Sequence, residues 1–265
     1  VLIGDVGVKK STPILALKSI LDAVPDLRFS QSRIAKAEDL VQALHGEGET
    51  KDEEDIWESD GETDYSKLFI LNDEATEIFG QGNPHLLSLY TAIWQLQGKH
   101  RTKSLKGKLL EVDSPCPSIL TATTPKQLSL IAPPALAVEG FLSRLILVYS
   151  RPTLQKVAFG ADMSESDKSL FTVKFMEIQN FTAGAKLVLS PRAKDLLEKI
   201  YLSNECVQDG RFAGYNNRRF THLLKLCVVS AAADLTSTIT PEHVAYSYST
   251  LWHIEQFMPQ ALGEY

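Results

Sequence analysis

A loop rich in glycine and lysine near the start of the chain has residue types that could bind phosphate. Residues 4–12 read Gly-Asp-Val-Gly-Val-Lys-Lys-Ser-Thr, after a short apolar run and before a helical pattern. The phosphate-binding pattern is Gly, four residues, then Gly-Lys-Ser/Thr, and only Lys9 departs from it. Backbone N–H groups at a helix N-terminus bind phosphate oxygens, a lysine neutralises the β- and γ-phosphates, and a hydroxyl binds Mg²⁺. The loop therefore predicts a site for ATP and Mg²⁺.

The predicted nucleotide ligands of this loop are Gly4, Gly7, Lys9, Lys10, Ser11 and Thr12, and Ser11 is also a predicted metal ligand. Lys9 stands where the pattern has glycine. That glycine often adopts a backbone conformation that costs a residue with a Cβ atom about 1–2 kcal/mol. The extra ammonium also adds positive charge near the phosphates. The sequence leaves open whether Lys9 modifies the predicted ATPase activity or abolishes it.

Adjacent acids follow a second apolar run, which covers residues 68–71. An apolar strand that ends in acids places carboxylates at the carboxyl edge of a parallel sheet, where α/β folds bind ligands. There Asp73 is predicted to bind Mg²⁺ through water. Glu74 is predicted to orient and deprotonate the attacking water.

Three further positions could act on the γ-phosphate. Thr124 ends a third apolar run and could reach the phosphate or the water, with Thr123 as the second choice. Arg144 directly precedes a fourth apolar run and could act on the nucleotide of a neighbouring subunit. Arg218 begins a long helical pattern and could contact the γ-phosphate, although the adjacent Arg219 is confusable with it.

The periodicity of the sequence predicts the elements that position these residues. Apolar runs at 1–3, 68–71, 117–122 and 145–149 predict buried strands. Helical patterns cover 12–24, 38–44, 75–80, 85–97, part of 126–139, a segment from Pro191 on, 217–235 and 241–258. Strands alternate with helices early and helices alone come late. We therefore expect an α/β core with a parallel sheet over 1–155, a connecting segment over 156–189 and a helical lid over 190–265.

Composition excludes several classes of protein. The chain has 265 residues, of which 44% are hydrophobic and 23% charged, so it is not disordered, collagenous or held together by disulfides. The three cysteines suit a reducing compartment. Residues 45–66 carry ten acids and one base, an acidic loop that leaves +3 on the rest of a chain whose net charge is −6. The chain begins inside an apolar run without Met, which predicts a fragment of a longer protein.

Taken together, these motifs resemble the AAA+ ATPases, in particular the minichromosome maintenance and superfamily-3 helicase branch. Residues 119–125 resemble the sensor-1 strand, with Thr124 in place of Asn. Residues 142–145 resemble the arginine-finger motif Leu-Ser-Arg-Phe-Asp, with Leu-Ile in place of Phe-Asp. Residues 218–226 parallel the sensor-2 helix, with Lys225 in place of a later Arg. The pattern is also similar to primase-helicase-like proteins of phages and mobile elements, where Lys-Lys-Ser replaces Gly-Lys-Ser.

The resemblance implies a P-loop NTPase fold of the AAA+ type and a hexameric ring with ATP between subunits. It implies a helicase that moves single-stranded DNA, joined to an upstream primase or DNA-binding domain, in the cytoplasm of a bacterium or an infected host. It also implies a DNA-contacting hairpin before the sensor-1 strand. The basic stretch 99–112 fits this hairpin, and its DNA ligands would be Lys103, Lys106 and Lys108.

Other interpretations stay open. The chain could be a catalytically weak or inactive nucleotide-binding ring that clamps DNA, because Lys9 disturbs the loop pattern. It could also be a helicase loader or a packaging motor of the same class. The sequence leaves open whether Arg218 acts on the nucleotide of its own subunit or on that of a neighbour.

Overall fold

The computed structural model describes residues 1–25, 27, 29–30, 33–34, 36–45, 67–94, 99–103, 109–133, 140–151, 163–182, 186–203 and 205–263. Most of the predicted acidic loop, residues 46–66, lies outside them. Lys106 and Lys108 lie outside them as well. Within the described part of the chain, no helix has the length and apolar character needed to cross a membrane.

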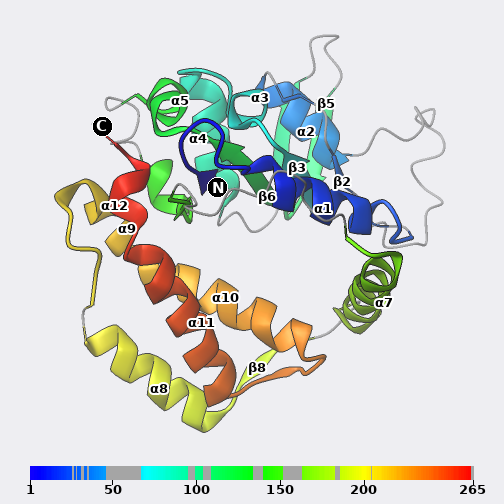
Figure 1. Cartoon of the computed structure of the whole chain (residues 1–265), viewed down its shortest axis with the longest axis vertical. Helices are drawn as coiled ribbons and strands as arrows, with labels where there is room; N and C mark the ends of the chain where they lie inside the picture. The colour runs from blue at the N-terminus through cyan, green and yellow to red at the C-terminus, as the bar shows by residue number, and fades with distance from the viewer. Residues whose placement is uncertain are drawn as a thin grey trace.

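A five-stranded parallel sheet forms the centre of the α/β fold, as the sequence predicts (Figure 1). Its strands, in spatial order, are β2 (Phe29–Ser30), β3 (Lys67–Asn72), β6 (Cys116–Thr123), β1 (Leu2–Ile3) and β7 (Val148–Tyr149). β1 pairs with β6 on one side and with β7 on the other. Because every pairing is parallel, the carboxyl ends of all strands lie at one edge, which we call the carboxyl edge.

Alternate side chains of the sheet pack into different layers. On one face Leu71 and Ala122 contact Ile14 and Leu21 of α1 (Ser11–Leu21). On the other face Ile70 belongs to the largest apolar cluster, with side chains of α2 (Ala37–His45), α3 (Ala75–Phe79) and α4 (Pro84–Ile93). β4 (Lys99–Lys103) and β5 (Leu109–Asp113) form an antiparallel pair at the predicted basic stretch 99–112. The period-2 alternation of a strand thus explains the two layers.

Several helices begin at a polar cap followed by proline. Asn83 accepts a hydrogen bond from the N–H of Leu86 at 3.1 Å and precedes Pro84. Ser190 caps α8 (Pro191–Leu202) in the same way. Such caps satisfy backbone N–H groups that have no partner within the helix, and proline has no N–H to satisfy. Because caps and prolines are local features, the starts of the late helices could be predicted from the sequence.

The lid consists of α8, α10 (Arg219–Ala233) and α11 (Pro241–Glu255), with the short parallel pair β8 (Val188–Leu189) and β9 (Thr238–Ile239). These helices enclose their own apolar cluster and lie away from the sheet in Figure 1. Shorter segments return to the core: η3 (Gly210–Phe212), α9 (Ala213–Asn216) and α12 (Met258–Ala261) share an apolar cluster with Ile3 and Leu147. The lid is therefore attached to the sheet before α10 and after α11.

Some elements differ from the sequence predictions. The fourth strand covers only Val148–Tyr149, and a short 3-10 helix, η2 (Leu142–Arg144), precedes it. The segment 156–189 contains α7 (Glu165–Thr182), which the sequence did not indicate. No side chain of α7 is fully buried, so it lacks the apolar stripe on which helix prediction depends. α5 (Pro125–Ile131) is the described helix within the predicted range 126–139.

Candidate functional site

The Gly4–Thr12 loop joins the end of β1 to the start of α1. Gly4 donates its N–H to the carbonyl oxygen of Thr123 at 3.4 Å. A Cβ atom on Gly4 would lie 2.9 Å from the carbonyl oxygen of Ser150, so a larger residue cannot occupy this position unless the backbone shifts. Gly7 has a φ of 87°, a value that favours glycine. Both glycines are thus needed for the shape of the loop.

The two lysines of the loop have different environments. Lys9 is exposed and has a φ of 52°. This value lies in the left-handed region, which favours the glycine that the loop pattern has at this position. Lys10 is half-buried, and its ammonium donates to the carbonyl oxygens of Gly4 at 2.7 Å and Asp5 at 2.8 Å. Ser11 is the first residue of α1, so its N–H belongs to the helix N-terminus.

The two acids follow β3. Asp73 is exposed, and Glu74 is half-buried at the start of α3. The N–H of Glu74 donates to Oδ1 of Asn72 at 2.8 Å, and its Oε1 accepts a hydrogen bond from the hydroxyl of Thr76 at 3.1 Å. These two hydrogen bonds fix both the backbone and the carboxylate of Glu74.

The threonines at the end of β6 differ in their hydrogen bonding. Thr124 caps α5, since its hydroxyl oxygen accepts the N–H of Gln127 at 3.2 Å. The hydroxyl of Thr123 is buried and has no hydrogen-bond partner among the described residues. Among the described residues, the hydroxyl of Thr123 thus has no hydrogen-bond partner, whereas the sequence favours Thr124 as the residue that reaches the phosphate or the water.

The sheet order places these three segments at the same edge. β6 lies between β1 and β3, with Ile3 paired to Thr123 and Asn72 to Thr121. Neighbouring strands are about 4.8 Å apart, so the ends of β1 and β3 are separated by roughly 10 Å. The structure therefore brings the Gly4–Thr12 loop, Thr124 and the acids at 73–74 to one edge.

Arg144 lies at the opposite end of the sheet. In the parallel pairing of β1 with β7, Leu2 is opposite Val148, so a residue before Val148 is at the amino end while the loop follows the carboxyl end. Arg144 donates Nη1 to the carbonyl oxygen of Gly140 at 2.7 Å, and its Nε is buried without a partner in the described part of the chain. Arg144 is therefore not brought together with the loop of its own chain.

The two candidate arginines of the lid are now distinguishable. Arg219 is buried and its Nε bonds both carboxylate oxygens of Glu255, at 2.8 and 2.9 Å. Arg218 is half-exposed at the start of α10. His222, four residues after Arg218 on α10, bonds the carbonyl oxygen of Ser143, the residue before Arg144, at 3.0 Å, so the start of α10 lies against η2. Burial lowers the pKa of Arg144, and the positive charge of Arg218 lowers it further. Arg219 is thus a structural residue, and Arg218 belongs with Arg144.

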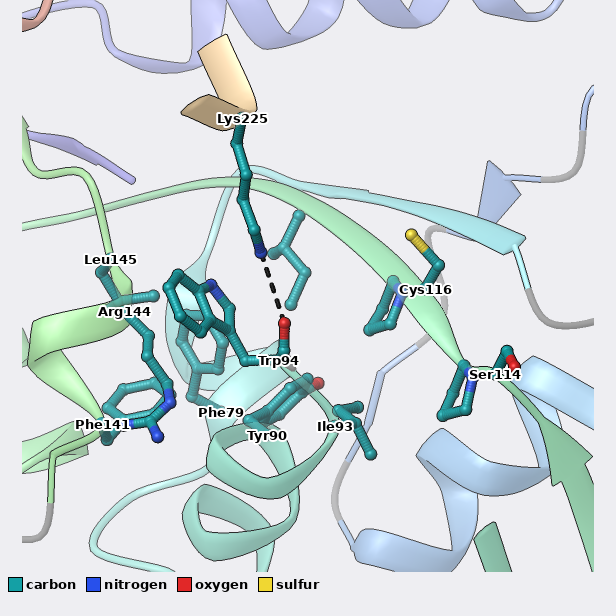
Figure 2. A pocket seen from close by; sticks show the side chains of 13 residues that line it. Phe79, Tyr90, Ile93, Trp94, Ser114, Cys116, Phe141, Arg144, Leu145 and Lys225 are labelled. Atoms are coloured by element: carbon teal, nitrogen blue, oxygen red, sulfur yellow. Dashed lines mark hydrogen bonds between the residues drawn. The ribbon is translucent and has the colours of Figure 1, made fainter. Parts of the chain in front are cut away.

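A cavity of about 420 Å³ lies at the junction of core and lid, and no sequence motif indicates it (Figure 2). We call it the junction cavity. It is lined by Phe79, Tyr90, Ile93, Trp94, Ser114, Pro115, Cys116, Pro117, Ile119, Phe141, Arg144, Leu145 and Lys225. Its residues come from segments far apart in the sequence. Only the tertiary fold brings them together.

The remaining predictions fall partly outside the described residues. Lys103 lies on β4 opposite Leu109, and the other two predicted DNA ligands of the hairpin are not described. No cluster of three or more histidine, cysteine or acidic residues suited to a metal occurs among the described residues. The predicted metal ligands, Ser11 and Asp73, are two oxygen donors.

Comparisons with known proteins give no further indication. No protein-family model matches the chain, and no curated protein matches it.

Proposed function

We propose that the chain is the ATPase motor core of a hexameric AAA+ DNA helicase, which moves single-stranded DNA during replication of a phage or mobile element. One observation carries the proposal. The Gly4–Thr12 loop and the acids at 73–74 lie at one edge of a parallel sheet, with one strand between them. A phosphate-binding loop and a pair of carboxylates at that spacing are what hydrolysis of a nucleoside triphosphate requires.

The loop binds the triphosphate. Lys10 already lies within the loop, where its ammonium bonds two carbonyl oxygens. Phosphate oxygens are charged acceptors and form stronger hydrogen bonds than carbonyl oxygens, so ATP can displace those contacts. The N-terminus of α1, an 11-residue helix, adds backbone N–H groups directed at the phosphates.

The oxygen donors of the loop and of β3 fit Mg²⁺. Magnesium in nucleotide sites takes one or two protein oxygens and completes its shell with phosphate and water, so a cluster of three protein ligands is not needed. The hydroxyl of Ser11 and the carboxylate of Asp73 are such donors. When bound, the metal neutralises charge on the phosphates.

Glu74 accepts the proton of the attacking water at its carboxylate. Its Oε1 already accepts the hydroxyl proton of Thr76 at 3.1 Å, and this contact orients the carboxylate. The second oxygen can then receive the proton. The hydroxyl of Thr123 or Thr124, at the end of the intervening strand, positions the water or the γ-phosphate.

Arg144 and Arg218 act on the nucleotide of a neighbouring subunit. η2, which carries Arg144, precedes β7 at the amino end of the sheet, and α10, which Arg218 precedes, bonds η2 through His222 and Ser143, whereas the loop of the same chain is at the carboxyl end. A ring supplies the missing arginines by placing the amino end of one subunit against the carboxyl edge of the next. The basic β4–β5 hairpin, including Lys103, binds DNA phosphates with an affinity that decreases as salt increases.

The Glu74→Gln substitution tests the proposal. Turnover of ATP should fall to background with and without single-stranded DNA, because the amide cannot accept the proton, while ATP binding persists. Glu77→Gln is the matched control: Glu77 lies three residues on and forms an exposed ion pair with Arg33 at 3.2 Å. That variant should keep its turnover. Normal turnover in Glu74→Gln would refute the assignment.

A second candidate is a ring that binds nucleotide and clamps DNA without hydrolysis. The positive φ of Lys9, 52°, favours it, because a lysine in the left-handed region holds the loop in a strained shape. A steady-state ATPase assay with the unmodified chain distinguishes the two. Nucleotide-dependent DNA retention with no turnover would support the clamp, and strand displacement on a forked duplex would separate a helicase from a helicase loader.

A further inference from the structure

The junction cavity is independent of the Gly4–Thr12 loop and has its own chemistry. Its lining includes Cys116, the first residue of β6, while the loop lies beyond the other end of that strand. At 420 Å³ it falls within the range of about 300–1,000 Å³ typical of small-molecule sites.

One wall of the junction cavity is aromatic. The rings of Phe79 and Tyr90 meet edge to face with centroids 5.2 Å apart, and Phe79 meets Phe141 in the same way at 5.1 Å. Tyr90 is further fixed by a hydrogen bond from its hydroxyl to the carbonyl oxygen of Ile78 at 3.1 Å. These contacts hold the wall in a fixed shape that suits a flat apolar group.

Two cations border the same cavity, one from the core and one from the lid. The guanidinium of Arg144 lies 5.6 Å from the ring centroid of Trp94, and the ammonium of Lys225 lies 3.9 Å from it. Lys225 reaches from α10 and donates to the carbonyl oxygen of Trp94 at 3.3 Å, as Figure 2 shows. Both cations therefore border one indole ring.

The described lining of the cavity supplies no carboxylate to balance these charges. None of its described lining residues is acidic, and Nε of Arg144 is buried without a hydrogen-bond partner in the same part of the chain. Burial lowers the pKa of Lys225, as it does that of Arg144, and for Lys225 the charge of Arg144 adds to this lowering while Cys116 opposes it. The half-buried guanidinium of Arg144 has no acceptor for its buried Nε among the described residues, which is costly unless an anion satisfies it.

We propose that the junction cavity binds a small aromatic anion, a body of one or two rings that carries a single carboxylate or a similar acidic group. The rings pack against the aromatic wall, and the anionic group binds between Arg144 and Lys225. Because one cation belongs to η2 of the core and the other to α10 of the lid, the bound molecule joins the two parts. The inference does not depend on ATP binding.

Cys116 provides a direct reporter for the experiment. Cys116 is exposed and lines the cavity, Cys206 is exposed elsewhere, and Cys227 is buried. The rate at which iodoacetamide alkylates each cysteine is measured by peptide mass spectrometry on the whole chain, without nucleotide. With 2-naphthoate as the probe, alkylation of Cys116 should slow severalfold, and that of Cys206 should not change.

Two comparisons test the anionic group. 2-Naphthamide has the same rings without the charge, so it should protect Cys116 about tenfold more weakly, and sodium sulfate should not protect at the same concentration. Lys225→Gln should weaken 2-naphthoate binding about tenfold, whereas Lys194→Gln, on the exposed face of α8, should not. Arg144→Gln is a second variant, and unchanged protection of Cys227 shows that each variant is folded.

Three results would overturn the inference. They are no protection of Cys116 by 2-naphthoate, equal protection by 2-naphthamide, and protection that persists when both Lys225 and Arg144 are replaced by Gln. Protection by sulfate alone would show an inorganic anion site and would likewise contradict the aromatic part. None of these outcomes depends on ATPase activity, so they are distinct from failure of the proposed function.

Discussion

The carboxyl edge of the sheet and the junction cavity are opposite in character. The edge combines a lysine with the acids Asp73 and Glu74 close to water, and the cavity combines aromatic rings with two cations and, among its described lining residues, no acid. β6 connects them, since Cys116 begins this strand and Thr124 directly follows it. Eight residues of strand span roughly 25 Å. The two ends of one strand therefore carry two separate polar regions with different chemistry.

The largest expected effect tests the proposed sharing of the ATP site between neighbouring subunits. Under that proposal Lys10→Ala should abolish turnover and Arg144→Ala should reduce it about 10³-fold, because each removes a positive charge that stabilises the phosphates. Mixing these two variants should restore part of the activity, since some interfaces then combine an intact loop with an intact arginine. ATPase assays of the mixtures measure the recovery.

The control for this mixture uses two lesions at the same end. Lys10→Ala mixed with Glu74→Gln should recover nothing, because both residues belong to the carboxyl edge of one subunit. A mixture of Lys10→Ala and Arg144→Ala that stays inactive would argue against a site shared between neighbours.

The second largest effect concerns stability at the lid. Arg219→Met should lower the free energy of unfolding by about 3–5 kcal/mol, because it leaves the buried carboxylate of Glu255 without its cationic partner and with only the hydroxyl of Tyr215 as a hydrogen-bond donor. Arg218→Met, on the adjacent half-exposed residue, should change it by less than about 0.5 kcal/mol. Urea denaturation checks both variants. An equal loss in the two would show that Arg219 does not have the structural role assigned to it.

A smaller effect should appear as a pH dependence. His222 is buried, its Nε2–H donates to the carbonyl oxygen of Ser143 at 3.0 Å, and burial lowers its pKa below the ordinary 6.5, with Lys225 and Arg218 contributing. Because the unfolded chain then binds the proton more tightly, stability should fall as the pH decreases below about 6.5. Urea denaturation midpoints across this range measure it. His222→Gln should flatten the profile, and an unchanged slope would contradict the assignment.

The smallest effect is expected in the loop. Lys9→Gly should raise stability by up to about 1 kcal/mol, because glycine adopts the observed φ of 52° without a Cβ penalty. Lys9→Ala keeps that penalty and is the matched control. Thermal melting of the two variants shows the difference, and an equal shift in both would mean that the backbone is not strained at Lys9.

The parts of the fold that follow from local patterns could be predicted from the sequence. The apolar run of β3 and the cap-and-proline starts of the lid helices require only neighbouring residues. The position of the loop and the acids at the carboxyl edge could also be predicted, because the carboxyl ends of parallel strands lie at the same edge of a sheet. The conformation of Lys9 also agrees with the missing glycine of the loop pattern.

Other parts depend on contacts between distant segments. No side chain of α7 is fully buried, so its sequence lacks the pattern of a packed helix and predicts only a connecting segment. The junction cavity requires Trp94, Arg144 and Lys225 to meet, and nothing in their spacing indicates this. The choice between Arg218 and Arg219 likewise needed Glu255, 36 residues along the chain from Arg219. Sequence periodicity contains no information on such pairs.

The double attachment of the lid restricts how it can move. The chain leaves the core after α9, forms the α10–α11 pair, and returns to the sheet through α12, which packs with β1 and Leu147. His222 and Lys225 of α10 add hydrogen bonds to the carbonyl oxygens of Ser143 and Trp94 in the core, at 3.0 and 3.3 Å. A rotation of the lid away from the core therefore has to break both of these contacts.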